Sequence, residues 1–429
     1  APDHSTIARF RTGFLLEACE DLFYQMVRRL KDAAELSVET VFIDGTKLEA
    51  CANKYTFVWK KSVGKWEEKM FQKIQEAVML LNHEYMQSFS VKIDSRIQDL
   101  QTITRYLENK CQQNGTVFVY GRGKRKSKNQ KYFELFRKFQ ERQVTYDWHT
   151  ASFQGRNNYC KTDPDATFMH MKDDHMRNAQ LKPGYNIQIG VDSEYIVATD
   201  VFSDRNDVWT LIPFLKTMDE KLGFRYPSVT ADSGYESEEG YTYLRETRQT
   251  PYIKPQTYEK WKRRSFKQDI SKRENMAYDA ETDVYTCYAQ KKLSPVFVKK
   301  QKSKSGYESE VTVYECEDCK DCPHKEKYTH AKGNKRLYVS KSFLEKRQES
   351  YENILTETGI QYRMNRSIQV EGAFGVLKND YEFQKFLLRG KTKVKLEILL
   401  LCMGYNLNKL HAKIQNERIG FHLFKVKSA

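Results

Sequence analysis

The sequence predicts a mixed α/β fold in which helices flank one sheet and two long insertions interrupt it. Three observations carry this prediction. Short β-branched runs at 41–48 and 228–235 each contain an Asp followed closely by Gly, a pattern typical of strands that end in a turn. Strand and helix patterns alternate from about 184 to 256. Charged helical sequence precedes that stretch, and basic, cysteine-bearing sequence follows it.

The predicted core elements follow one another in an informative order. The first is a strand that delivers Asp44. It is followed by paired strands at 185–191 and 194–202, a helix at 207–222, a strand at 228–231 that ends at Asp232, a helix at 238–247, a short strand at 251–254, and later helices at 368–381 and 394–410. This is the order of a ribonuclease-H-like mixed sheet, in which the first and fourth strands are neighbours. We therefore expect Asp44 and Asp232 to lie side by side.

Helical spacing dominates the first insertion and the N-terminus. Two apolar stripes predict helices that pack on one another: Phe71, Ile74, Val78, Leu81 and Tyr85, then Ile93, Ile97, Leu100 and Leu107. Near the N-terminus, Asp3, Ser5 and Thr6 are candidate caps for a helix that runs through Phe10 and Phe14 to about Leu30. The chain opens at Ala1, directly in this pattern, so we expect that something upstream is missing.

Composition favours a polyanionic partner. The 429 residues carry 72 Lys+Arg against 57 Asp+Glu, a formal net charge of +15, and such charge supplies most non-specific affinity for nucleic acids. A merely soluble basic protein is the alternative. The Gly-flanked loop at 120–131 should be exposed, either as a solvated linker or as a contact to DNA phosphates through Arg122, Lys124, Arg125 and Lys126. The longest apolar run, 398–403, is too short to span a bilayer.

Three acidic residues form the main candidate site. They are Asp44, Asp232 and Glu371, the last at the start of a helical pattern. Taken singly, an Asp beside Gly is most often a turn or cap residue. Carboxylates gathered together suit Mg²⁺, which takes oxygen ligands and leaves room for substrate phosphates. Two such ions can activate an attacking oxygen and stabilise the leaving oxygen of a phosphodiester.

These motifs resemble those of bacterial insertion-sequence transposases of the DDE class, in the branch with a helical insertion after the first Asp. The matching segments are 42–50, Asn53 with 55–60, 162–166, 182–186, 230–235 and 370–378. The resemblance implies that Asp44, Asp232 and Glu371 hold two Mg²⁺ or Mn²⁺ ions. It also implies strand cleavage at transposon ends, followed by transfer of the freed 3′-hydroxyl into target DNA. The implied partners are double-stranded DNA, as terminal inverted repeats and target, and a second copy of the chain in a homodimer. The implied location is the bacterial cytoplasm, at the nucleoid.

The resemblance also sets the expected domains. We expect a helical remnant of an N-terminal DNA-binding region at 1–37, a ribonuclease-H-like catalytic core made of 38–60, 160–256 and 357–412, a helical insertion at 61–159, a basic cysteine-bearing insertion at 257–356, and a C-terminal tail at 413–429. The family has an all-helical region that would precede Pro2. Without it, recognition of transposon ends or assembly of the paired complex is expected to be impaired.

Basic residues near the carboxylates are candidate phosphate ligands. Related transposases carry a Lys after the catalytic Glu, matched by Lys378, and an Arg four residues before it. The nearest Arg here is Arg366, and in an α-helix this one-residue offset turns a side chain by about 100°. Lys172 and Lys182 are further candidates, expected near the active site, with an irregular loop around 168–175. The alternative interpretation of this region is that Asp163, Asp165, His170 and His175 bind a metal ion. Trp209 and Trp261 are suited to stack on an unpaired base, although packing is the commoner use of Trp.

Four cysteines form a second candidate site. Cys287, Cys316, Cys319 and Cys322 have spacings that suit either a structural zinc site, with His324 and His330 as substitute ligands, or a set of reduced thiols. Nine cysteines, scattered and odd in number, favour a reducing compartment. Two further functions stay open: a nuclease or junction resolvase on the same fold, and an inactive DNA-binding relic of a transposon.

Overall fold

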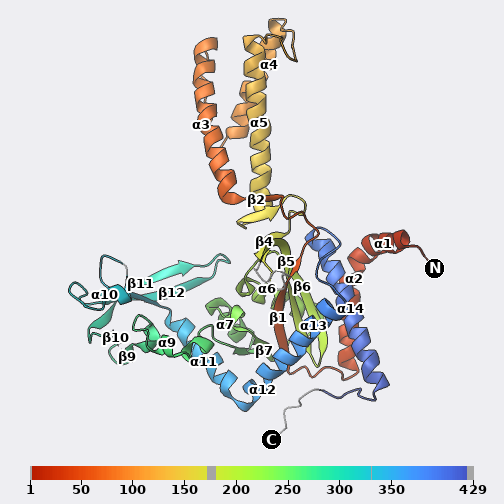
Figure 1. The fold of residues 1–429 in the computed structure, drawn as a ribbon, viewed down its shortest axis with the longest axis vertical. Helices are drawn as coiled ribbons and strands as arrows, with labels where there is room; N and C mark the ends of the chain where they lie inside the picture. The colour runs from red at the N-terminus through yellow and green to blue at the C-terminus, as the bar shows by residue number, and fades with distance from the viewer. Residues whose placement is uncertain (1, 172–179, 330, 423–429) are drawn as a thin grey trace. The chain divides into compact units, whose positions relative to one another are not determined.

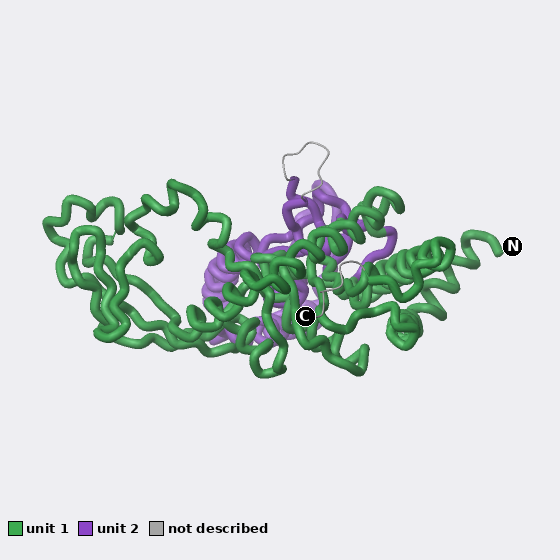
Figure 2. The backbone as a smooth tube through the Cα atoms, turned by 90° about the horizontal axis from the view of Figure 1, so that it is seen from below, with its two compact units in different colours: residues 1–48, 186–386, 391–429 green, residues 49–185, 387–390 purple. Residues whose placement is uncertain are grey.

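The structure is a computed structural model that describes residues 2–171, 180–329 and 331–422 of the chain (Figure 1). It divides into two compact units, drawn in different colours in Figure 2. Unit 1 contains residues 1–48, 186–386 and 391–429, and unit 2 contains 49–185 and 387–390. In the described part of the chain, no helix is both long enough and apolar enough to cross a bilayer.

A mixed sheet forms the centre of unit 1. Its order is β6 (Tyr195–Phe202), β5 (Leu181–Asp192), β1 (Thr40–Glu49), β7 (Ser228–Ala231) and β8 (Thr250–Ile253). The first pair is antiparallel, and β1, β7 and β8 run parallel to one another. The predicted α/β class and the predicted pairing of the first and fourth strands are therefore confirmed. β1 is longer than predicted: it continues past Asp44 to Glu49, beyond Ile43, where its pairing with β7 ends.

Helices pack on this sheet. α6 (Leu211–Leu222), preceded by the short helix η1 (Asp207–Trp209), packs on β6, and α14 (Lys391–Gln415) packs on β6 and α2 (Leu15–Asp32). α7 (Glu238–Glu246) and α11 (Lys341–Leu355) both contact β8. α6, α7 and α14 lie where the sequence predicted them, whereas α11 was not predicted. The expected single N-terminal helix is wrong, because α1 (His4–Gly13) ends where Gly, a weak helix former, precedes the exposed Phe14. The predicted cap at Asp3 is confirmed: its side chain accepts a hydrogen bond from the Thr6 N–H.

A buried ion pair ties α14 to the chain just before β1. Lys413 Nζ lies 2.9 Å from Glu35 Oε2, and the two side chains are 4% and 0% exposed. The Tyr195 hydroxyl and the Gly420 N–H also donate to this carboxylate. Burial opposes ionisation of Glu35, but the contacts with Lys413, Gly420 and Tyr195 outweigh it and lower its pKa.

Replacing Lys413 by Met should lower the free energy of unfolding by about 3–5 kcal/mol at pH 7, because it leaves a buried carboxylate without a counter-charge. The matched variant is Lys409→Met, because the ion pair of Lys409 with Glu194 is partly exposed. It should lower the free energy of unfolding by about 1 kcal/mol or less. A lowered folded-state pKa stabilises the fold above the ordinary Glu value of 4.5, and this stability is lost as the pH falls through the lowered pKa. The difference between wild type and Lys413→Met should therefore shrink on acidification. Urea denaturation at several pH values tests this, and equal losses for the two variants would contradict it.

The segment 257–356 contains a second sheet that the sequence did not predict. It is antiparallel, in the order β13 (Arg336–Val339), β12 (Glu308–Cys316), β11 (Lys292–Lys302), β10 (Val284–Thr286) and β9 (Ala277–Asp279). All but one of the residues of β11 are exposed. A strand with no buried face leaves no alternation of apolar and polar residues to detect. The same segment contains the short helices α8 (Tyr258–Trp261), α9 (Arg264–Lys267) and α10 (Lys325–Tyr328), and it ends with α11.

Unit 2 contains three long helices with a core of their own. α3 (Lys60–Tyr85), α4 (Arg96–Gln113) and α5 (Lys128–Phe153) bury Ile74, Val78, Leu81, Leu100 and Leu107, as the stripes predicted. Ile93 is an exception: it precedes α4 and is 68% exposed. β2 (Phe57–Trp59) pairs with β3 (Asn158–Cys160). The predicted irregular loop around 168–175 is wrong for its first residues, because β4 (Thr167–His170) pairs with the start of β5.

Candidate functional site

Asp44 and Asp232 lie at the same level on neighbouring parallel strands. The register pairs Ile43 of β1 with Ala231 of β7, and each Asp is the next residue. Neighbouring strands are about 4.8 Å apart, so side chains at equal level on parallel strands are close. The pKa of Asp44 is raised, first by burial and further by the negative charge of Asp232, while Arg366 opposes the rise. The sheet therefore holds two carboxylates close together, which is electrostatically unfavourable. A cation bound beside them reduces this repulsion.

Arg366 supplies one such cation. Its Nη1 lies 3.0 Å from Asp44 Oδ2, and the two side chains are 13% and 25% exposed. The other oxygen, Oδ1, accepts a hydrogen bond from the Gly45 N–H at 2.8 Å. The predicted phosphate ligand therefore contacts the first carboxylate of the site directly.

A fourth acidic residue, which the sequence did not reveal, lies beside this pair. Asp207, at the start of η1, accepts hydrogen bonds from Asn186 (2.8 Å) and Gln188 (3.1 Å) of β5. The Tyr235 hydroxyl donates to Gln188. Burial raises the pKa of Tyr235, and the charges of Asp207, Asp44 and Asp232 raise it further. In the sequence Asp207 looked only like the first residue of a helix, where Asp is common.

Glycines let the backbone approach this polar network closely. A Cβ added to Gly45 would lie 2.2 Å from Gln188 Nε2 and 3.0 Å from Asp207 Oδ1. A Cβ on Gly234 would lie 3.4 Å from Asp207 Oδ2. Gly45 lies inside β1 rather than at its end, and a side chain there would displace the Gln188 amide that holds Asp207.

Glu371 belongs to a continuous helical segment that also carries Arg366. The segment consists of α12 (Glu357–Arg366), the π-helical turn η4 (Ser367–Glu371), α13 (Gly372–Gly375) and a second π-helical turn, η5 (Val376–Asp380). A π turn closes its hydrogen bond one residue later than an α turn. An Arg five residues before Glu371 therefore lies close to where a four-residue spacing would place it in a regular α-helix. The π turn η4 therefore accommodates the one extra residue between Arg366 and Glu371.

The structure brings together two of the three predicted carboxylates. The Glu371 side chain is exposed. Among the described residues, no three His, Cys, Asp or Glu side chains are grouped so that they could hold a metal ion. Asp44 and Asp232 nevertheless offer the oxygen donors that Mg²⁺ and Mn²⁺ prefer. The assembly of Glu371 with them stays a prediction.

A cationic cleft opens beside Asp232. Its volume is about 490 Å³, and its lining includes Asp232, Lys254, Arg363, Arg366 and Ser367. Arg363 has a buried Nε atom with no hydrogen-bond partner in the described structure. Arg366 also pairs with Asp44, and Lys254 pairs with Glu259 at 2.7 Å. Cations grouped in this way suit a phosphate group that approaches Asp232.

The sequence comparisons agree with this chemistry. Residues 286–411 match the family model of a transposase DDE domain. The match supports a DDE-class transposase, a class that generally uses divalent metal ions, and it suggests a transposition activity. It includes Arg366 and Glu371 but neither Asp44 nor Asp232, and it covers under a third of the chain. No curated protein and no solved structure matches the sequence.

The other predicted phosphate ligands fall outside this cluster. Lys378 is half-buried on η5. Lys182 pairs with Glu49 at 2.9 Å, and Lys172 lies outside the described residues. Arg122, Lys124 and Arg125 are exposed in the irregular stretch between α4 and α5, whereas Lys126 pairs with Glu134. Their contacts with DNA stay predictions.

Asp163 has a structural role in unit 2. Its buried carboxylate accepts hydrogen bonds from the Tyr185 hydroxyl at 2.8 and 2.9 Å and from the Gly390 N–H at 3.2 Å. The alternative interpretation, in which Asp163 is a metal ligand, also included His175, which lies outside the described residues. For the residues that are described, the grouping required for a metal ion is not present there.

The four candidate zinc ligands lie in the core of the second sheet. Cys287, Cys316 and Cys319 are buried, Cys322 is half-buried, and all four are free thiols. Burial, with smaller contributions from the neighbouring Cys319 and Cys287, raises the pKa of Cys316 to about 12. Zinc requires thiolates, and the described side chains are not grouped as a metal site. His330 lies outside the described residues. Structural zinc at Cys287, Cys316, Cys319 and Cys322 stays a prediction.

Proposed function

We propose that this chain is a DNA transposase that cleaves strands at transposon ends and transfers the freed 3′-hydroxyl into target DNA in a metal-dependent reaction. The observation that carries the proposal is the register of β1 and β7, which makes Asp44 and Asp232 neighbours. The family match over the segment that contains Glu371 supports it. So does the strand order, which is that expected of a ribonuclease-H-like core.

In the proposed site each side chain has a distinct task. Asp44, Asp232 and Glu371 would hold two Mg²⁺ or Mn²⁺ ions, which when bound supply activation of the attacking oxygen and stabilisation of the leaving oxygen. Asp207, held by Asn186 and Gln188, adds negative charge beside the pair. Lys254, Arg363 and Arg366 would position the phosphate next to Asp232. Lys378 would contact the DNA backbone further along the same helical segment.

The partners follow from the same proposal. The substrate is double-stranded DNA, first as the terminal repeats and then as the target, and the net charge of +15 favours it. Two copies of the chain would assemble on the paired ends. A plain nuclease on the same fold is the second candidate, because it needs the same carboxylates.

The test is a cleavage and joining assay on DNA that carries the sequences flanking the coding region. With Mg²⁺ or Mn²⁺ we expect nicks at the repeat ends and covalent joining of the 3′-ends to a target plasmid. Chelation by EDTA should abolish both products. Cleavage without joining would favour the nuclease, and DNA binding without either product would contradict the proposal.

A further inference from the structure

A groove on unit 2 is lined by cations from two of its long helices. Its volume is about 500 Å³, within the roughly 300–1,000 Å³ of ligand pockets. The helices α3 and α5, which pack on each other, form it. α3 contributes Trp66, Lys69 and Lys73, which lie on one face because helix residues three or four positions apart are neighbours. α5 contributes Arg142.

The cations of this groove lack acidic partners. In the part of the chain that the structure describes, Lys69, Lys73 and Arg142 have no carboxylate within ion-pair distance. Glu141, the residue before Arg142, pairs with Arg137 instead. The described lining of the groove contains neither Asp nor Glu. Positive charges gathered without a counter-charge repel one another, and a bound anion would reduce this repulsion.

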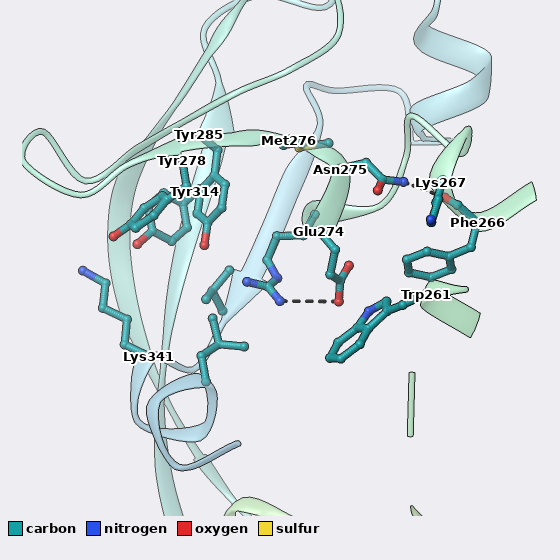
Figure 3. Close-up of a pocket in the computed structure, with 13 residues that line it drawn as sticks. Trp261, Phe266, Lys267, Glu274, Asn275, Met276, Tyr278, Tyr285, Tyr314 and Lys341 are labelled. Atoms are coloured by element: carbon teal, nitrogen blue, oxygen red, sulfur yellow. Dashed lines mark hydrogen bonds and ion pairs between the residues drawn. The ribbon is translucent and has the colours of Figure 1, made fainter. Parts of the chain in front are cut away.

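The larger cavity in the segment of the second sheet differs in this respect. Its volume is about 720 Å³, and it belongs to unit 1 (Figure 3). Of the three cations in its lining, Arg273 pairs with Glu274 at 3.4 Å and Lys341 pairs with Asp283 at 2.7 Å. Because two of its three cations are neutralised within the protein, the groove of unit 2 is better suited to an anion.

The floor of the groove is apolar. Met70, Phe139 and Tyr146 line it, are buried and belong to the core of the helical unit. Charges of one sign above walls of low polarity focus the electric field and raise the local concentration of counter-ions. Trp66 is exposed in the same lining, and its indole N–H is a further hydrogen-bond donor.

The helices of unit 2 are basic beyond this groove. Residues 60–153, which span α3 to α5, contain 18 Lys and Arg against 10 Asp and Glu, a net charge of +8. This is more than half of the +15 of the whole chain, in fewer than a quarter of its residues. A small anion would use only the groove, whereas a long polyanion is attracted by the whole surplus.

We propose that the groove between α3 and α5 holds the sugar-phosphate backbone of duplex DNA, with Lys69, Lys73 and Arg142 on phosphates, and that it does so without reading the sequence. Phosphate contacts position a protein on DNA and carry no sequence information. This inference rests on the proposed function only in that DNA is the substrate. Unit 2 follows directly on β1, so DNA held there is held by an insertion next to the strand of Asp44 in the sequence.

The experiment measures DNA binding by the full chain at several KCl concentrations, in EDTA so that no strand is cut. The probes are two duplexes of equal length and unrelated sequence. Each phosphate contact contributes about 0.9 to the slope of log affinity against log salt concentration. In the double variant Lys69→Gln/Arg142→Gln we therefore expect the slope to fall by about 1.8, and the affinity at about 0.1 M KCl to fall roughly 60-fold, for both duplexes alike.

The matched control is Lys128→Gln/Arg137→Gln. It removes the same charge from the same helices, but from cations that pair with Glu84 and Glu141. All four substituted side chains are exposed, so neither double variant should unfold, and equal melting temperatures check this. The control should keep the salt dependence of the wild type.

Three results would overturn the inference. The first is an equal slope for wild type and Lys69→Gln/Arg142→Gln. The second is a loss of affinity confined to one of the two duplexes, because the groove would then read sequence. The third is unchanged DNA binding with loss of self-association in sedimentation, because a second copy of the chain would then occupy the groove.

The two proposals fail separately. A chain that cuts and joins DNA, but whose groove variant keeps the wild-type salt slope, refutes only the groove inference. A chain whose groove variant loses DNA affinity as expected, but which shows no metal-dependent cleavage, refutes only the proposed function.

Discussion

Replacing Glu371 by Gln should abolish strand cleavage, by roughly 10³-fold or more, and leave DNA affinity nearly unchanged. The substitution removes a negative charge from an exposed side chain and keeps its size, so the fold has no reason to change. The proposed metal site loses one of its three carboxylates, and the reaction depends on all of them as a unit. Single-turnover cleavage of a labelled transposon end, beside a filter-binding measurement, separates the two effects.

Glu246→Gln is the matched control for this change. Glu246 is an exposed Glu at the end of α7, and its substitution should leave both cleavage and binding at wild-type levels. If Glu371→Gln cleaves within about tenfold of wild type, Glu371 is not the third carboxylate. If wild type and variant both bind DNA and neither cleaves, the chain is a DNA-binding relic.

Replacing Arg366 by Ala should lower cleavage by about 10²-fold and at the same time tighten Mn²⁺ binding. Arg366 lies 3.0 Å from Asp44 Oδ2 and lines the cleft next to Asp232. Its loss removes a phosphate ligand from the cleft. It also removes the cation that competes with a metal ion for Asp44. Cleavage rates and a Mn²⁺ titration followed by electron paramagnetic resonance check the two directions.

Opposite changes in the two quantities distinguish this role from simple unfolding, which would weaken both. Arg366→Lys should recover part of the cleavage, because it restores the charge without the planar fork of the guanidinium. Arg245→Ala, which breaks only exposed pairs with Glu345 and Glu349, should leave both quantities unchanged. Weaker Mn²⁺ binding by Arg366→Ala would contradict the assigned role.

The core strands and the neighbouring positions of Asp44 and Asp232 were predictable, because buried strands carry a continuous apolar signal and strand order restricts the topology. The second sheet was not predictable, since β11 is almost wholly exposed. Asp207 was missed because a residue that acts through tertiary neighbours, here Asn186 and Gln188, has no local pattern. The effect of the five-residue spacing between Arg366 and Glu371 was misjudged, because the prediction assumed a regular α-helix between them. The structure has the π turn η4 there.

The most direct test of the central claim is a crystal structure of the chain soaked with Mn²⁺, with the metal located by anomalous scattering. The account predicts a Mn²⁺ peak coordinated by both Asp44 and Asp232, and its loss in Asp232→Asn. A wild-type protein that cleaves DNA with Mn²⁺ but binds the ion elsewhere, with no peak at these two carboxylates, would contradict it.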